Sequence, residues 1–168
     1  MRKERAFTLV EILVVVVLLG ILAVVVLPLV AGSSISAKES ALALDLQMLR
    51  RYVLVYKTQH LEVGPGYPDG DTTQAPTEPV FIEQTTMSSN PSGQTAAVGT
   101  AGYERGPYLM KIPVNPVNNL STVQLLGDAE AFPANADDSH GWIYKASTSE
   151  VRSDSTGTND NGKPYYDY

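Results

Sequence analysis

The sequence predicts an α+β fold in which one long N-terminal α-helix packs on a small antiparallel sheet of three or four strands. Three observations predict it: residues 7–31 are almost wholly apolar, residues 32–61 carry an apolar residue every three or four positions, and residues 106–168 contain short alternating segments between turns. The sequence contains no crossover helices for a parallel α/β fold, and it contains too few strands for a β-sandwich. The 168 residues suffice for one domain with an appendage.

The composition argues against nucleic-acid binding and against most kinds of catalytic or metal site. The chain has 12 Lys and Arg and 18 Asp and Glu, a net charge of −6, which disfavours nucleic acid as a primary ligand. It has no cysteine, which excludes disulfides, thiolate metal sites and cysteine nucleophiles. Its two histidines lie far apart, and no nucleophile–base pair stands out. We therefore predict that the chain is not an enzyme.

The N-terminus is a short basic segment, residues 1–6, followed by an apolar one. Residues 7–31 contain a single charge, Glu11. As a helix of about 1.5 Å per residue this stretch is about 37 Å long, which exceeds a hydrocarbon core of about 30 Å. The preceding positive charges predict a cytoplasmic N-terminus and an exported remainder. The apolar region is longer than the roughly 7–15 residues of an ordinary secretory signal, which argues against a cleaved signal peptide. Cleavage near Ala31 is the alternative.

Glu11 is unexpected in such a segment. A carboxylate inside a membrane span costs about 2–4 kcal/mol, so a segment that serves only as an anchor would carry an apolar residue there. Either Glu11 lies at the interface or is protonated, or it awaits a positive partner in an assembly.

Residues 5–13, RAFTLVEIL, resemble the prepilin processing motif of type IV pilins and type II secretion pseudopilins. The resemblance implies that a prepilin peptidase cuts between Ala6 and Phe7 and methylates the new amino group. Gly20 and Pro28 match a glycine and a proline of the family's helix. Ala6 departs from the family, which usually has glycine before the cut.

The resemblance also implies how subunits assemble. The ammonium of Phe7 in one subunit would meet the Glu11 carboxylate of a neighbour, an attraction that is strong where water is excluded. Gly20 and Pro28 would weaken the helix between them. The implied partners are identical subunits, prepilin peptidase, an inner-membrane assembly platform, and the membrane before assembly. The implied location is the inner membrane for the precursor, and then an extracellular or periplasmic filament.

Residues 32–61 are predicted to continue the helix as an amphipathic segment, with Gly64-Pro65-Gly66 ending it. Its apolar stripe consists of Ile35, Leu42, Leu46, Leu49, Val53 and Tyr56. We expect the stripe to form the core of a globular head. A coiled-coil dimer is the competing interpretation, but it would have a short seam.

Residues 62–105 contain five prolines before residue 92 and many small polar residues, which predicts a variable surface loop region. Within it, Val80-Phe81-Ile82 is compatible with one short strand.

Residues 106–168 are predicted to form a β-sheet head with a C-terminal loop. Residues 106–116, GPYLMKIPVNP, resemble a stretch of the major pseudopilins. The strand-like segments are 121–126, 141–146 and 150–152, the last two joined by a turn at 147–149. Trp142 and Tyr144 share one face of a strand, so we expect them to pack on the helix stripe.

The C-terminal loop contains oxygen ligands of the kind that calcium prefers. The resemblance to major pseudopilins implies a calcium site near this end, for which Asp154, Asp160 and Asn161 are the candidates. Other acidic candidates are Asp128, Asp137 and Asp138. A solvated acidic loop without a metal is the alternative, and no other cofactor is expected.

Together these features predict a structural subunit of a type IV pilin-like helical filament, with residues 1–6 as leader peptide and residues 7–31 in the filament core. One alternative is the major pseudopilin of a type II secretion system. A second is a singly membrane-anchored, exported binding domain that forms no filament.

Overall fold

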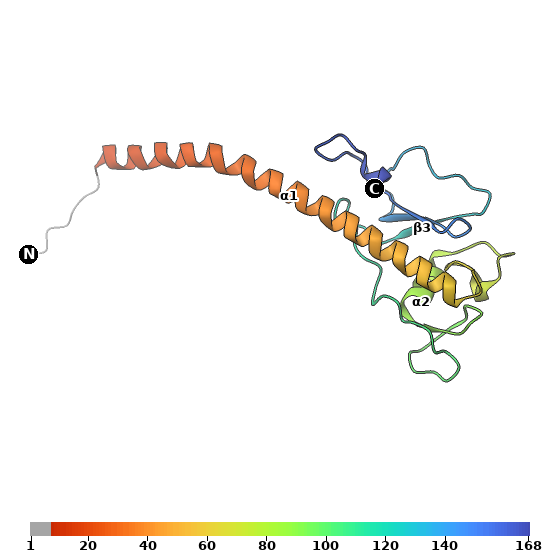
Figure 1. The fold of residues 1–168 in the computed structure, drawn as a ribbon. Helices are drawn as coiled ribbons and strands as arrows, with labels where there is room; N and C mark the ends of the chain where they lie inside the picture. The colour runs from red at the N-terminus through yellow and green to blue at the C-terminus, as the bar shows by residue number, and fades with distance from the viewer. Residues whose placement is uncertain (1–7) are drawn as a thin grey trace, which may run out of the picture. The chain divides into compact units, whose positions relative to one another are not determined.

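The computed structural model describes residues 8–168, except for the side chains of residues 25–34. The chain divides into two compact units, Met1–Ala37 and Lys38–Tyr168, and the second is called the globular unit below. Helix α1 spans Leu9–Gln59, so the predicted long helix is confirmed (Figure 1).

The predicted apolar stripe of α1 forms the main core of the globular unit. Ile35 lies outside that unit and is 41% exposed, whereas the other five stripe residues are at most 1% exposed. They pack with Phe81, Val123, Trp142, Tyr144 and Val151. The head therefore covers five of the six stripe residues within one chain, and the expectation fails for Ile35.

The sheet has three strands in the order β3-β4-β5: β3 is Val123–Leu126, β4 is Trp142–Lys145 and β5 is Glu150–Ser153. The predicted hairpin is confirmed, because β4 and β5 pair antiparallel. However, β3 pairs parallel with β4, so the sheet is mixed and the antiparallel expectation fails for this pair. Residues 127–141 join the two strands, and a connection of this length lets the chain return to the starting end of β3, which a short hairpin turn cannot do.

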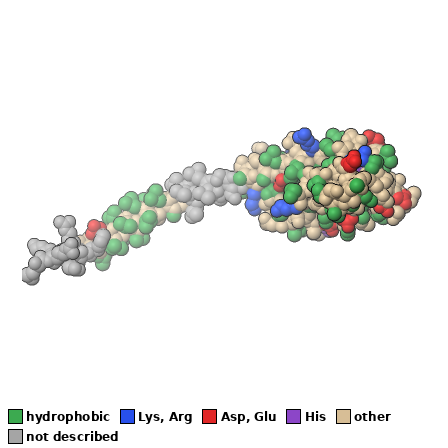
Figure 2. Space-filling model, turned by 90° about the horizontal axis from the view of Figure 1, so that it is seen from below, with side chains coloured by type: hydrophobic (Ala, Val, Ile, Leu, Met, Phe, Trp, Pro, Cys, Tyr) green, Lys and Arg blue, Asp and Glu red, His purple; other side chains and the backbone are tan. Residues whose placement is uncertain are grey.

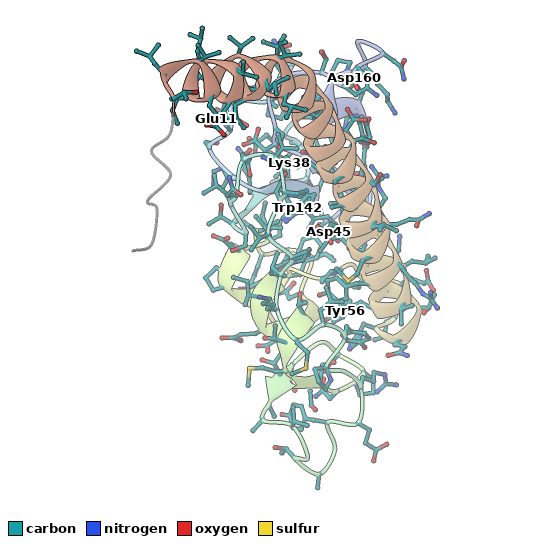
Figure 3. The ribbon with its side chains drawn as sticks, turned by 90° about the vertical axis from the view of Figure 1, so that its left-hand side faces the viewer. Glu11, Lys38, Asp45, Tyr56, Trp142 and Asp160 are labelled. Atoms are coloured by element: carbon teal, nitrogen blue, oxygen red, sulfur yellow. The ribbon has the colours of Figure 1, made fainter. Side chains whose placement is uncertain are left out.

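Both faces of the sheet are covered. Trp142 and Tyr144 lie in the main core, as expected from their shared face, and Figure 3 shows Tyr56 and Trp142 between α1 and the rest of the globular unit. Ile143 points to the opposite face, where it packs with Leu126 and Tyr166 in a second cluster. Tyr166 belongs to η2, a 3-10 helix at Tyr165–Asp167.

Residues 62–105 are more regular than expected. The segment predicted as a strand, Val80-Phe81-Ile82, lies inside helix α2, Glu78–Thr86, so the strand expectation is wrong. Pro79 lies in the first turn, where its missing N–H costs nothing. The buried residues Phe81, Gln84 and Thr85 follow the helical spacing of three and four, which a three-residue apolar run does not reveal.

The remaining elements of this region are short. They are η1 at Pro68–Gly70 and an antiparallel pair of two-residue strands, β1 at Ser88–Ser89 and β2 at Thr95–Ala96. The buried amide of Gln84 holds this region together: its nitrogen donates to the carbonyl oxygens of Tyr67 at 3.1 Å and Gly93 at 2.8 Å, and its oxygen accepts from Gly66 N–H at 2.7 Å.

Candidate functional site

Glu11 lies in the first turn of α1, next to a capping residue. The Glu11 N–H donates to the Thr8 carbonyl at 3.1 Å and to Thr8 Oγ1 at 3.3 Å, so Thr8 caps the helix. An acid three positions after a threonine cap is favourable at the positive end of the helix dipole. The Thr8-x-x-Glu11 spacing therefore gives Glu11 a local role that the resemblance alone did not indicate.

The helix segment around Glu11 is apolar and uncovered. Every residue from Thr8 to Val24 is exposed, and the large hydrophobic side chains there are between 47% and 83% exposed. Figure 2 shows these hydrophobic side chains along the surface of the segment. An apolar helix surface without a partner in its own chain needs lipid or another chain to cover it.

The other residues predicted to serve processing and assembly are Ala6, Phe7, Gly20 and Pro28. Ala6 and Phe7 lie outside the described residues. Pro28 lies within the bounds of α1, but its side chain is outside the description. Gly20 lies in open space, since a Cβ built there meets no atom within 4 Å. In the part of the chain that the structure describes, no helix combines the length and apolarity needed to span a bilayer.

The stretch at residues 106–116 ends in a buried anchor, Asn115. Its side-chain nitrogen donates to the Gly141 carbonyl at 2.8 Å, Ser153 Oγ at 3.0 Å and Ser155 Oγ at 2.8 Å. Its side-chain oxygen accepts from Val117 N–H at 2.9 Å. One amide thus joins the start of β4 to the end of β5, a role that the motif did not reveal.

The same stretch makes two further contacts with the core. The indole N–H of Trp142 donates to the Pro113 carbonyl at 2.9 Å. The N–H groups of Tyr108 and Leu109 both donate to the Thr85 carbonyl of α2. Residues 106–116 therefore connect the sheet to α2.

Asp154, the first metal candidate, is buried and already satisfied. One carboxylate oxygen accepts from Asp137 N–H at 3.0 Å, and the other accepts from His140 N–H at 2.9 Å and Ser139 Oγ at 3.2 Å. Nearby, the Asp138 carboxylate accepts from Thr156 N–H and from the Thr156 hydroxyl. These bonds tie the 137–140 loop to the residues that directly follow β5.

The other two metal candidates are exposed. Asp160 lies on the surface (Figure 3), and the Asn161 N–H donates to Asn159 Oδ1. No hydrogen bond among the described residues joins either to Asp154, and no group of three or more His, Asp or Glu side chains gathers there as a metal site. The Asp154 carboxylate accepts hydrogen bonds from the 137–140 loop, and calcium binding at Asp154, Asp160 and Asn161 stays a prediction.

His60, which looked undistinguished in the sequence, is buried directly after α1. Its ring stacks on Tyr56 with centroids 3.7 Å apart. Its Nδ1 lies 2.7 Å from the Tyr56 carbonyl and its Nε2 2.9 Å from Ser89 Oγ, so Nδ1 carries the proton and Nε2 accepts. Burial lowers the pKa of His60 below its usual value, and the nearby Arg105 adds to this, while the hydrogen bond to the Tyr56 carbonyl opposes it.

Comparison with known proteins agrees with these features. Residues 1–27 match the family model described as the prokaryotic N-terminal methylation motif. The chain is 31% identical over 120 residues to the type II secretion system core protein G of Vibrio cholerae serotype O1, covering 71% of this chain and 69% of that protein.

Two further relatives carry the same name. The Pseudomonas aeruginosa protein is 32% identical over 118 residues, covering 70% of this chain and 71% of the relative. The Klebsiella pneumoniae protein is 30% identical over 116 residues, covering 69% and 71%. No solved structure matches the chain. The prepilin-type motif and these relatives show that the chain belongs to the type II secretion core protein G family, within the type IV pilin and pseudopilin superfamily.

Proposed function

We propose that this chain is the major pseudopilin of a type II secretion system, a structural subunit that assembles into a helical filament through its N-terminal helix. One observation carries the proposal: residues 8–24 expose apolar side chains all round the helix, while the globular unit completes its core without them. A helix that its own chain leaves uncovered is suited to a bilayer and then to a bundle of identical helices.

Processing would precede assembly. In this proposal a prepilin peptidase cuts between Ala6 and Phe7, and the methylated ammonium of Phe7 pairs with Glu11 of a neighbouring subunit. Removal of Arg2, Lys3, Glu4 and Arg5 leaves 9 basic and 17 acidic residues, a net charge of −8 before the termini. Glu11 is exposed at the end of α1, where a neighbour has access to it.

Before assembly the precursor would reside in the inner membrane with its N-terminus in the cytoplasm, held by residues 7–31. An inner-membrane platform would then move it into a periplasmic filament. Gly20 supports packing in that filament, because a Cβ built there meets no described atom within 4 Å, which leaves room for a neighbouring helix to approach.

The names of the relatives and the 106–116 stretch favour the secretion role over a surface pilus used for attachment or motility. The alternative without a filament is a singly anchored, exported binding domain.

The test has two parts, both carried out in the cells that naturally produce the protein. The first is the N-terminus and intact mass of the chain isolated from cells: we expect it to begin at Phe7 and to carry one extra methyl group. A chain that begins at Met1 or near Ala31 would instead favour the anchored or secreted domain.

The second part is deletion of the gene, with proteins in the medium and filaments on the surface both measured. Loss of secreted proteins supports the pseudopilin. Normal secretion together with lost surface filaments would favour the surface pilus.

A further inference from the structure

Helix α1 has a second apolar face, away from the core, which forms a groove on the globular unit. Leu44, Met48, Arg51 and Val55 recur at spacings of four, three and four, so they share one side of the helix. The side chains of Leu44 and Met48 are 65% and 38% exposed. We call this surface the outer groove.

Two adjoining hollows form the outer groove. A hollow of about 550 Å³ is lined by Leu44, Gln47, Met48 and Arg51. A second, of about 170 Å³, is lined by Met48, Arg51, Tyr52, Val55, Tyr108 and Leu109. Because Met48 and Arg51 line both, the groove runs from the helix onto residues 108–109, next to the 91% exposed Met110.

Arg51 gives the outer groove a positive charge that pairs with no carboxylate of the described residues. The ion pair found among the described residues joins Arg152 to Glu150, and no carboxylate of residues 8–168 as described lies within 4 Å of the Arg51 guanidinium. Arg50, the preceding residue, instead donates to the Val151 and Tyr168 carbonyls. Arg51 is therefore exposed and free to meet an external carboxylate.

Charge is divided unevenly over the globular unit. Residues 38–61 carry four basic and two acidic side chains, whereas residues 62–168 carry five basic and fourteen acidic ones. The helical part thus has a formal charge of +2 and the remainder −9. Nine of those fourteen acidic residues are exposed.

This division favours a particular contact between identical copies. Two acidic surfaces repel each other, whereas the helix face of one copy attracts the acidic surface of another. Such a contact joins two different surfaces, and repeated heterologous contacts that do not close into a ring generate a helical filament.

We propose that the outer groove binds a second copy of this chain, through an exposed acidic segment of that copy's residues 62–168 that pairs with Arg51. This inference rests on the proposed filament and adds the surface by which neighbouring globular units contact each other. Leu44 and Met48 supply the apolar floor of the contact, and Arg51 selects the acidic partner.

The test places a photo-reactive amino acid at position 48 of the full chain, expressed in its own cells. Position 54 is the matched control: Leu54 is 62% exposed on the same helix, lines neither hollow, and lies about 120° around the helix from Met48. We expect a cross-linked dimer from position 48, with the partner peptide within residues 62–168, and about tenfold less from position 54.

Charge variants form the second arm. Arg51→Glu should reduce filaments about tenfold, while Arg51→Lys retains most of them. Fluorescence of Trp142, the single tryptophan, shows whether each variant is folded. Replacing the acid identified by the cross-link with lysine should restore assembly of Arg51→Glu.

Each contrary result has a definite meaning. Wild-type filaments with no position-48 cross-link, or with a cross-link to residues 8–24 or to another protein, would overturn the groove assignment and leave the proposed function intact. Absence of wild-type filaments would overturn both.

Discussion

At the scale of single residues, the globular unit depends on buried polar side chains whose partners lie far away in the sequence. Asn115 joins residues 26, 38 and 40 positions away with one amide group. Asp154 serves the 137–140 loop in the same way. A buried polar group that loses its partner retains its desolvation cost, so such residues are sensitive to substitution.

Asn115→Ala should lower the free energy of unfolding by about 2–4 kcal/mol, because it removes three buried hydrogen bonds, to the Gly141 carbonyl and to two serine hydroxyls. Urea denaturation followed by Trp142 fluorescence measures this. Asn161→Ala, at an exposed position, is the control and should stay within about 0.5 kcal/mol of wild type. Equal effects of the two substitutions would contradict the bridging role.

His60 should make stability depend on pH. Since burial lowers its pKa in the folded state, the unfolded chain binds a proton first as the pH falls below about 6.5. Its contribution to stability is therefore present at neutral pH and is lost from about pH 6.5 down to the lower folded pKa. When the pH is lowered from 7 to 5, the free energy of unfolding of His60→Gln should therefore fall by less than that of the wild type.

The measurement is a series of urea midpoints across that pH range. Tyr56→Phe is the matched control, because it changes the ring that stacks on His60 without removing the histidine. It should keep the wild-type slope against pH. An unchanged slope in His60→Gln would show that this histidine does not contribute.

At the scale of elements, α1 performs two tasks with two faces. The face carrying Leu46 is buried in the core, and the face carrying Leu44 lines the outer groove. The stripe at spacings of three and four predicted the first face. The second face could not be predicted from the sequence. Its apolar residues can be recognised as an exposed surface only after the structure shows which side of the helix packs against the core.

Leu46→Ala should destabilise the globular unit by about 2–5 kcal/mol through the cavity it leaves, since Leu46 is 1% exposed. Leu54→Ala, on the same helix at 62% exposure, should change stability by about 0.5 kcal/mol or less. Thermal unfolding of the two variants compares them directly. Similar melting temperatures would mean that α1 is not packed on the sheet in solution.

At the scale of the whole molecule, the two compact units differ in what they require. The globular unit has closed cores on both faces of its sheet, whereas residues 8–24 remain uncovered. We therefore expect substitutions in the N-terminal unit to impair assembly and to leave the fold of the globular unit unchanged.

Glu11→Ala should leave membrane insertion intact and abolish filaments, because apolar substitution favours the membrane and removes the partner of the Phe7 ammonium. Filaments released from the periplasm and the membrane fractions of the same cells provide the measurement. Glu11→Gln separates charge from size and should fail as well. Normal filaments from either variant would rule out the pairing.

The sequence by itself determined the long helix, the buried stripe on it, the β4–β5 hairpin and the processing motif. Each is written in residues close to one another, as a repeat of three and four, an alternation of two, or a contiguous match. Only the tertiary structure decided that β3 pairs parallel with β4, that Val80–Ile82 is helical, that Asn115 and Asp154 bridge distant segments, and that His60 is buried. These features depend on which distant segments meet in the fold, and no local pattern of side chains specifies that meeting.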